Sequence, residues 1–177
     1  MEDNIALFFW GLNNTIVFSI FKIISSKIYI IITSGIFIIY AVIKLKKQSI
    51  QFLITLIISV SASDVICYRL LKPAIMRERP KVELKISSRS IETTRNYTMP
   101  SNHASNTFAF FIAYFLLIKR YWQILLANSL LISFSRIVLV KHYPTDVMVG
   151  IATGIIIGLC TVYLISLIYK RKGIYDL

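Results

Sequence analysis

Charged residues are scarce in this chain of 177 residues, and acidic residues are the scarcest of them. Only 16% of the residues are charged, against about 25% in an average soluble domain. The chain holds 8 Asp and Glu beside 20 Lys and Arg, and only 2 His. Hydrophobic residues make up 56%, which is more than one small soluble core can bury. The composition therefore favours a membrane protein with several spans.

Cysteine is also rare. The two cysteines, Cys67 and Cys160, both lie inside apolar runs. No cluster of Cys and His has the spacing of zinc ligands, and two cysteines are too few for a disulfide framework. We therefore expect no metal site and no disulfide framework, and we assign both cysteines to packing.

Five apolar runs, together with their flanking residues, are long enough to cross a bilayer. They cover residues 28–43, 50–71, 103–118, 121–140 and 146–169. Nothing alternates like a strand of a membrane barrel, and only closed backbone hydrogen bonding is stable in lipid. We therefore predict an all-α, polytopic membrane helical bundle that forms a single domain over residues 1–177.

The N-terminal segment is a weaker candidate for a span. Residues 5–21 are apolar, but Asn13 and Asn14 interrupt them. Two acidic residues precede the run and no cleavage site is evident, so a signal peptide is not indicated. The central asparagines favour interfacial helices within residues 1–24 over a sixth span. The predicted bundle thus has five or six transmembrane helices.

Short basic segments mark one side of this bundle. The turns at 44–47 and 119–120 and the tail at 170–172 are rich in Lys and Arg, which predicts a cytoplasmic location. The segments 72–100 and 141–146 then lie on the opposite face. The net charge of +12 is concentrated in these turns and in the 72–100 loop. This distribution fits membrane topology and an anionic ligand better than nucleic acid.

Three residue blocks fall on the non-cytoplasmic face, although charge alone decided the orientation. The first block is Lys72 followed, after six residues, by Arg79-Pro80. The second block is Pro100-Ser101-Asn102-His103. The third block is Ser135-Arg136, then His142 after five residues, and Asp146 after three more. Both histidines of the chain belong to these blocks. We therefore predict one shared site at this face of the membrane.

The third block has the parts of an activated nucleophile. Asp146 follows His142 by four residues, so its carboxylate can reach back to the imidazole. A carboxylate on one ring nitrogen fixes the tautomer and leaves the other nitrogen free to attack. The planar guanidinium of Arg136 suits bidentate phosphate binding.

The second block predicts an anion site at the start of a helix. Ser101 is a good N-cap, and the backbone N–H groups that follow it can face an anion. His103 then lies in the first turn, where it can donate a proton to a leaving oxygen. Lys72 and Arg79 suit the phosphate oxygens. Further loop cations bind either an anionic headgroup or only solvent and lipid; they are Lys81, Lys85, Arg89 and Arg95.

One acidic residue lies inside a predicted span. Acids in membrane helices are rare and usually paired. We therefore expect Asp64 to brace the bundle through Arg69, Lys72 or Arg136 rather than to take part in catalysis.

Together the three blocks resemble the three-part signature of the type 2 phosphatidic acid phosphatase superfamily. Order and internal spacing agree over roughly 75 residues. The one departure is Asn102, where the family usually has Gly. Asn tolerates unusual backbone dihedrals, and Asn102 is either a neutral replacement or adds a side-chain contact to the substrate.

The resemblance implies a role for each residue. His142 would be the nucleophile that forms a phosphohistidine, Asp146 would orient it, and His103 would protonate the leaving group. The phosphate oxygens would be held by Lys72, Arg79, Ser101 and Arg136, with Asn102 beside them. Family members of this kind use no metal and no other cofactor, and water then releases inorganic phosphate.

Among compact bacterial members, the chain most resembles lipid A 1-phosphatases, since the basic loop suits a bulky, multiply charged saccharolipid. This likeness implies a multi-pass protein of the bacterial inner membrane with its active site facing the periplasm. Undecaprenyl pyrophosphate, phosphatidylglycerophosphate and phosphatidic acid are alternative substrates. The expected partners are the phosphorylated lipid and surrounding membrane lipids, with no nucleic acid and no obligate protein partner.

Two other classes share parts of this pattern. Vanadium-dependent haloperoxidases carry the same signature, but they are soluble, and the continuous apolar runs disfavour them. A non-catalytic protein that binds anionic lipid could use the same cations. Such a protein would have no need for two histidines and Asp146 at these spacings.

Overall fold

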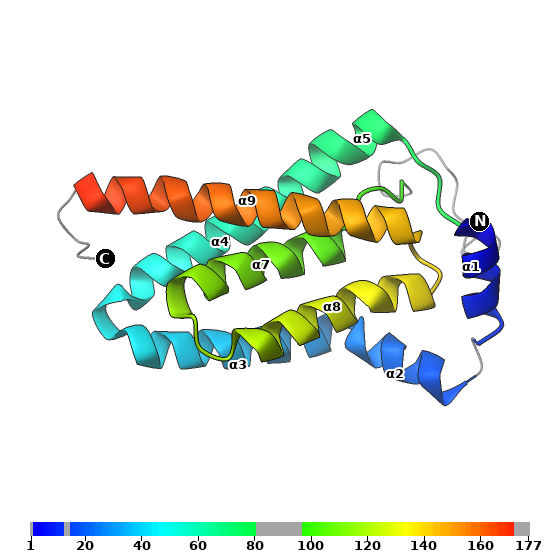
Figure 1. The fold of residues 1–177 in the computed structure, drawn as a ribbon, viewed down its shortest axis with the longest axis horizontal. Helices are drawn as coiled ribbons and strands as arrows, with labels where there is room; N and C mark the ends of the chain where they lie inside the picture. Colours follow the sequence, from blue (N-terminus) through cyan, green and yellow to red (C-terminus); the bar gives the residue numbers. More distant parts are fainter. Residues whose placement is uncertain (1, 13–14, 81–96, 172–177) are drawn as a thin grey trace.

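The computed structural model describes residues 2–12, 15–80 and 97–171, and within these ranges every regular element is a helix (Figure 1). The all-α prediction is therefore confirmed for the described residues. The helices are α1 (Glu2–Trp10), α2 (Ile16–Ile24), α3 (Lys27–Leu45), η1 (Lys46–Gln48), α4 (Ser49–Val65), η2 (Ile66–Leu71), α5 (Lys72–Ile75), α7 (Asn102–Ile118), α8 (Trp122–Val138) and α9 (Pro144–Arg171).

Each predicted apolar run coincides with helical structure, in the order α3, α4 with η2, α7, α8 and α9. Among the described residues, two helical segments are long and apolar enough to cross a membrane: Lys27–Ile75, which includes α3 to α5, and Pro144–Tyr169. Helices α7 and α8 have 17 residues each, fewer than the roughly 20 that a bilayer core requires. The number of five or six spans therefore stays a prediction.

The N-terminal segment forms two separate helices of nine residues each, α1 and α2. Each has about half of the roughly 20 residues that a transmembrane helix needs. α1 runs across one end of the bundle, beside the turn between α8 and α9 (Figure 1). This geometry agrees with interfacial helices, while their placement in a membrane stays a prediction.

The basic turns and the signature blocks lie at opposite ends of the bundle. η1, the turn between α7 and α8 and the end of α9 lie at one end of the bundle, on the left in Figure 1. α1 and the turn between α8 and α9 lie at the other end. This separation follows from the antiparallel order of successive helices. The predicted gathering of the signature blocks at one end is thus present.

Helix α7 forms the centre of the bundle, and most of its length is buried. α9 packs against it through Gly150, Gly154 and Gly158. A Cβ atom added at Gly154 would lie only 2.2 Å from the carbonyl oxygen of Ser105, which belongs to α7. Small residues let two helix backbones approach closely. The contact fixes the first turn of α9 beside the first turn of α7, where the second and third blocks lie.

The connection from α4 to the first block is a π-helix, η2, which ends directly before Lys72. π-helices are rare and occur frequently at functional sites. The helical path then continues through α5 to Ile75. The loop predicted over residues 72–100 therefore starts later than expected, because Lys72 still has helical backbone geometry.

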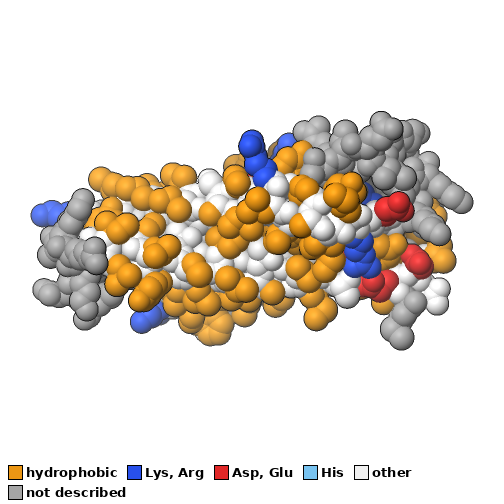
Figure 2. All heavy atoms as spheres, turned by 90° about the horizontal axis from the view of Figure 1, so that it is seen from above, with side chains coloured by type: hydrophobic (Ala, Val, Ile, Leu, Met, Phe, Trp, Pro, Cys, Tyr) orange, Lys and Arg blue, Asp and Glu red, His pale blue; other side chains and the backbone are white. Residues whose placement is uncertain are grey.

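Large apolar side chains cover the outside of the bundle along its length (Figure 2). Examples from three helices, α3, α4 and α9, are Ile31, Ile57, Met148 and Leu164, each more than half exposed. Soluble monomers rarely expose contiguous apolar surface on this scale. Such a surface is stable when lipid rather than water covers it.

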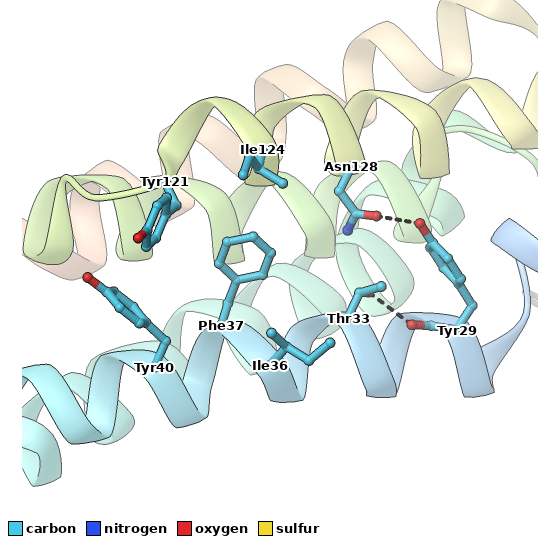
Figure 3. Close-up of a pocket in the computed structure, with 8 residues that line it drawn as sticks. All are labelled: Tyr29, Thr33, Ile36, Phe37, Tyr40, Tyr121, Ile124 and Asn128. Carbon is cyan, nitrogen blue, oxygen red and sulfur yellow. Dashed lines mark hydrogen bonds between the residues drawn. The ribbon is translucent and has the colours of Figure 1, made fainter.

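An apolar cavity of about 460 Å³ opens between α3 and α8 (Figure 3). The residues that line it are Tyr29, Thr33, Ile36, Phe37, Tyr40, Tyr121, Ile124 and Asn128. Two of its polar side chains bind each other, since the Tyr29 hydroxyl donates to Oδ1 of Asn128 at 2.8 Å. None of the lining residues is charged, so this cavity does not suit phosphate chemistry.

Candidate active site

Asp146 is fully buried in the first turn of α9 and accepts hydrogen bonds on both carboxylate oxygens. Its Oδ1 accepts from Nη1 of Arg77 at 2.9 Å. Its Oδ2 accepts from the hydroxyl of Thr98 at 2.6 Å and from the backbone N–H of Tyr143 at 2.7 Å. A carboxylate at a helix N-terminus is further stabilised by the helix dipole. Asp146 is therefore held in one position.

His142 lies in the turn that precedes α9 and is also buried. Its Nδ1 lies 3.9 Å from Oδ2 of Asp146, which is too long for a hydrogen bond. The same nitrogen lies 3.0 Å from the hydroxyl oxygen of Thr98. The carboxylate is thus near the imidazole as predicted, but the Thr98 hydroxyl stands between the two groups.

Burial lowers the pKa of His142, and the positive charges of Arg136, Arg79 and Lys72 lower it further, to well below its ordinary value of 6.5. The imidazole is therefore neutral at pH 7. A neutral imidazole keeps a lone pair on one nitrogen, which is the form that a nucleophile requires.

Three cations from separate elements surround His142, and each donates to a protein oxygen. Lys72 is buried, and its ammonium group donates to the carbonyl of Tyr97 at 3.0 Å. Nη1 of Arg79 donates to the carbonyl of Lys141 at 3.1 Å. Nη1 of Arg136 donates to the hydroxyl of Ser25, between α2 and α3. These bonds orient the cations predicted to hold phosphate.

Ser101 occupies the N-cap position of α7, as predicted, but its side chain makes no capping hydrogen bond. Its backbone N–H donates to the carbonyl of Asp146 at 3.0 Å, and the residue is fully buried. Its hydroxyl has no partner among the residues that the structure describes. A buried hydroxyl without a partner is costly, so it marks a place where a ligand oxygen can bind.

His103 lies in the first turn of α7 and is partly buried. The positive charges that act on it come from Arg136, Lys141 and Lys72. Two of these, Arg136 and Lys72, also act on His142. The two histidines therefore share one cationic environment, as the predicted phosphate site requires.

Asp64 binds amide groups in place of the predicted cations. Its Oδ1 accepts from Nδ2 of Asn102 at 2.9 Å and from Nδ2 of Asn106 at 3.0 Å. The expected brace therefore exists, but its partners lie on α7 and are not Arg69, Lys72 or Arg136. One N–H of the Asn102 amide is engaged by this contact, so any hydrogen bond to a phosphate oxygen would come from its second N–H.

A family model described as PAP2 superfamily matches residues 49–170, which include all three signature blocks. The chain belongs to the PAP2 superfamily. The family predicted from the three blocks is therefore confirmed. No solved structure gives a significant match to this PAP2 chain.

Two curated relatives are both named lipid A 1-phosphatase. The protein of Rhizobium etli is 34% identical over 77 residues, which cover 44% of this chain and 32% of the relative. The protein of Rhizobium johnstonii is 32% identical over 77 residues, which cover 44% of this chain and 30% of the relative. The PAP2 chain thus spans about a third of the length of the curated relatives that it matches. These findings support the expectation of a phosphatase that acts on lipid.

Three residues that sequence reasoning did not assign to this PAP2 site lie within it. Thr98 has no fixed spacing to a histidine, and only its position two residues before Pro100 could have drawn attention to it. Arg77 lies between Lys72 and Arg79 and has no place in the signature, although it binds Asp146. Glu2, from α1, forms an ion pair with Arg77. The additional predicted cations Lys81, Lys85, Arg89 and Arg95 lie outside the described residues.

Arg77 joins α1 to the turn that holds His142. Its guanidinium also donates to the hydroxyl of Thr145 and lies over the ring of Tyr143, with 4.4 Å from Cζ to the ring centroid. Burial acts to lower the pKa of Arg77, but the hydrogen bond to Glu2 and the charge of Asp146 outweigh it and raise this pKa. Arg77 therefore stays charged and balances the buried carboxylate of Asp146.

Proposed function

We propose that this chain hydrolyses a phosphate group from a membrane lipid through a phosphohistidine on His142, without a metal ion. The observation that carries the proposal is a neutral, buried imidazole surrounded by Arg136, Arg79 and Lys72. Cations placed in this way bind the phosphate oxygens and leave the nucleophile unprotonated. Membership of the PAP2 superfamily supports the same chemistry.

In the first step, Nε2 of His142 attacks phosphorus and the bond to the lipid oxygen breaks. In the substrate complex, where the phosphate charge offsets the nearby cations, protonated His103 gives a proton to that leaving oxygen. The three cations and the Ser101 hydroxyl stabilise the charge that builds up on the transferring group. In the second step, water attacks the phosphohistidine and gives a proton to His103. The phosphorus–nitrogen bond breaks, phosphate leaves, and His142 returns to its neutral form.

The 1-phosphate of lipid A is the substrate that we propose. Both curated relatives are named lipid A 1-phosphatase. The apolar outer surface supports a multi-pass protein of the bacterial inner membrane. The basic turns at the end opposite His142 support an active site that faces the periplasm.

The first prediction is that His142→Ala loses all measurable phosphate release, because alanine has no nitrogen that can accept the phosphoryl group. The assay uses the purified full chain in detergent with lipid A, undecaprenyl pyrophosphate, phosphatidylglycerophosphate and phosphatidic acid. Cys160→Ser, an exposed position outside the signature, is the control and should match wild type. Rapid alkaline quenching of wild type with labelled lipid should trap an acid-labile phosphoprotein that His142→Ala lacks.

The outcomes separate the chemistry from the substrate. Preference for lipid A together with an inactive His142→Ala supports both parts of the proposal. Preference for another lipid of the panel keeps the phosphatase and replaces the substrate. If wild type binds these lipids but releases no phosphate from any of them, the chain is a lipid-binding protein and the proposed function is wrong.

A further inference from the structure

Thr98 lies in the short segment that leads from the first block into α7, and it is not part of the family signature. The residue is fully buried. Its backbone N–H donates to the carbonyl of Arg77 at 2.8 Å, which anchors the segment to the first block. Its hydroxyl oxygen lies 2.6 Å from Oδ2 of Asp146 and 3.0 Å from Nδ1 of His142. One hydroxyl therefore contacts both members of the proposed nucleophilic pair.

The direction of these two hydrogen bonds follows from the chemistry of the groups. An ionised carboxylate can only accept, so the Thr98 hydroxyl donates its single proton to Asp146. The oxygen of Thr98 can then only accept from the imidazole. Because His142 is neutral, its one ring proton must lie on Nδ1. Nε2 is left with the lone pair that attacks phosphorus.

Asp146 cannot replace Thr98 in this arrangement by a small movement. Its Oδ1 is held by Arg77, and its Oδ2 accepts the backbone N–H of Tyr143 in addition to Thr98. A shift toward His142 would lengthen these bonds, which are among the strong, charge-assisted kind. The separation of 3.9 Å between Nδ1 and Oδ2 is therefore maintained, and the hydroxyl bridges it.

We propose that Thr98 is the positioning residue for the nucleophile, and that it relays the charge of Asp146 to His142. This inference rests on the proposed function of the same site. Thr98 fixes the ring in the tautomer with Nδ1 protonated. When Nε2 is phosphorylated, the imidazole gains positive charge, and the Nδ1–H to Thr98 to Asp146 chain stabilises it. Asp146 acts on the nucleophile through this chain and not by direct contact.

The second prediction compares Thr98→Val with Thr98→Ser. Valine keeps the branched shape but removes the hydroxyl, whereas serine keeps the hydroxyl and removes one methyl group. We expect Thr98→Val to lower kcat on the order of 10- to 100-fold, as loss of a histidine-orienting partner does elsewhere. KM should change less than kcat, because Thr98 does not touch the substrate. Thr98→Ser should restore most of kcat.

A spectroscopic measurement reports the tautomer independently of activity. The chain has only two histidines, so the 15N spectrum of tag-free, histidine-labelled protein has two imidazoles, and His142→Ala identifies one of them. We expect His142 of wild type to carry its proton on Nδ1. In Thr98→Val, the population with the proton on Nε2 should rise.

The results distinguish this inference from the proposed function. If wild type is active and Thr98→Val keeps both its kcat and the Nδ1 tautomer, the Thr98 inference is wrong while the phosphatase stands. If wild type releases no phosphate, the function is wrong, and the tautomer of wild type still tests the bridge. A wild-type His142 with its proton on Nε2 overturns the inference even if Thr98→Val does not fold.

Discussion

The cations that act on the imidazole of His142 are the same ones that are proposed to bind the phosphate. Burial lowers the pKa of the imidazole, and the charges of Arg136, Arg79 and Lys72 lower it further. When a phosphate dianion binds, its charge offsets these cations. We therefore expect the proposed nucleophile to stay unprotonated before the substrate arrives and to become more basic once the substrate is bound. One set of side chains performs both tasks.

The third prediction concerns pH and follows from this arrangement. The folded-state pKa of His142 lies well below 6.5, so the neutral nucleophile persists as the pH falls through 6.5. We expect the acid limb of kcat/KM, which reports the free enzyme, to lie below pH 6.5. The acid limb of kcat should lie at higher pH, because bound phosphate offsets the cations. Rates from about pH 4 to pH 8 would measure both limbs.

The same pKa shift has a consequence for stability, with a definite sign. Below pH 6.5 the unfolded chain protonates this histidine while the folded protein does not, so the free energy of unfolding falls as the pH decreases. Above pH 6.5, this pKa shift does not lower the free energy of unfolding. An acid limb of kcat/KM at or above pH 6.5 would contradict the neutral, cation-surrounded imidazole.

At the residue scale, sequence spacing predicted the charged residues and the histidines of the site. It did not predict the Thr98 hydroxyl, which connects His142 to Asp146. His142 and Asp146 are four residues apart, which predicts that they are neighbours. The distance between their polar atoms depends on where Arg77 and Tyr143 hold the carboxylate. Thr98 reaches the site through the fold, 44 residues away from His142 along the chain, so no local pattern indicates it.

At the scale of elements, the position of the site depends on how closely α7 and α9 pack. Gly150 and Gly154 lie opposite backbone atoms of Ser101 and Ser105. The first pair adjoins the N-cap of α7, so any separation of the two helices would move Ser101 away from the turn that holds His142. The contact between the helices therefore sets the size of the phosphate site.

The fourth prediction compares two glycine substitutions of the same kind. Gly154→Ala would place a Cβ 2.2 Å from the carbonyl of Ser105, so the helices must separate. Overpacking of this kind costs about 1–3 kcal/mol. Gly35, in α3, has no atom within 4 Å of an added Cβ, and Gly35→Ala should stabilise its helix by about 0.5–1 kcal/mol.

Thermal unfolding in detergent measures the difference. Gly154→Ala should lower Tm, at roughly 2–4 °C per kcal/mol for a chain of this length. Gly35→Ala should leave Tm equal or higher. Phosphate release should fall in Gly154→Ala and not in Gly35→Ala. Equal Tm values for the two variants would mean that α7 and α9 do not depend on close backbone contact.

The positions of the long helices were predictable because each one is a continuous apolar run between charged or polar turns. The break between α1 and α2 was also indicated, by Asn13 and Asn14 within the run. The continuation of helical structure to Ile75 was not, since α5 contains Pro73 and is followed by a basic segment. The pairing of α9 with α7 depends on three-dimensional packing that hydrophobicity alone does not encode.

At the scale of the whole molecule, a basic turn lies at one end of the bundle and the candidate site lies at the other. One end has the basic turn at η1. The other has the turn that holds His142, which is joined to α1 through Glu2 and Arg77. The positive-inside rule predicts that the first end is cytoplasmic. The lipid phosphate would then be hydrolysed on the opposite side of the membrane.

The fifth prediction tests this orientation. Gln48→Cys and Glu78→Cys introduce thiols at exposed positions near opposite ends of the bundle. A Cys160→Ser background removes the exposed native thiol, and Cys67 is buried. In intact spheroplasts, a membrane-impermeant maleimide should label Glu78→Cys, and it should label Gln48→Cys only after lysis. The reverse pattern would place the site in the cytoplasm.

The π-helix η2 has a consequence for how relatives are aligned. A π-turn holds one residue more than the α-helical path that it interrupts, and one residue corresponds to about 100° around a helix. A relative without this feature would lack one residue between Ile66 and Leu71 and still present its lysine to the phosphate. An alignment that forbids gaps inside apolar helices would then pair Lys72 with the wrong position. Relatives should therefore be aligned on Lys72 first, and the alignment should then be extended toward the start of α4.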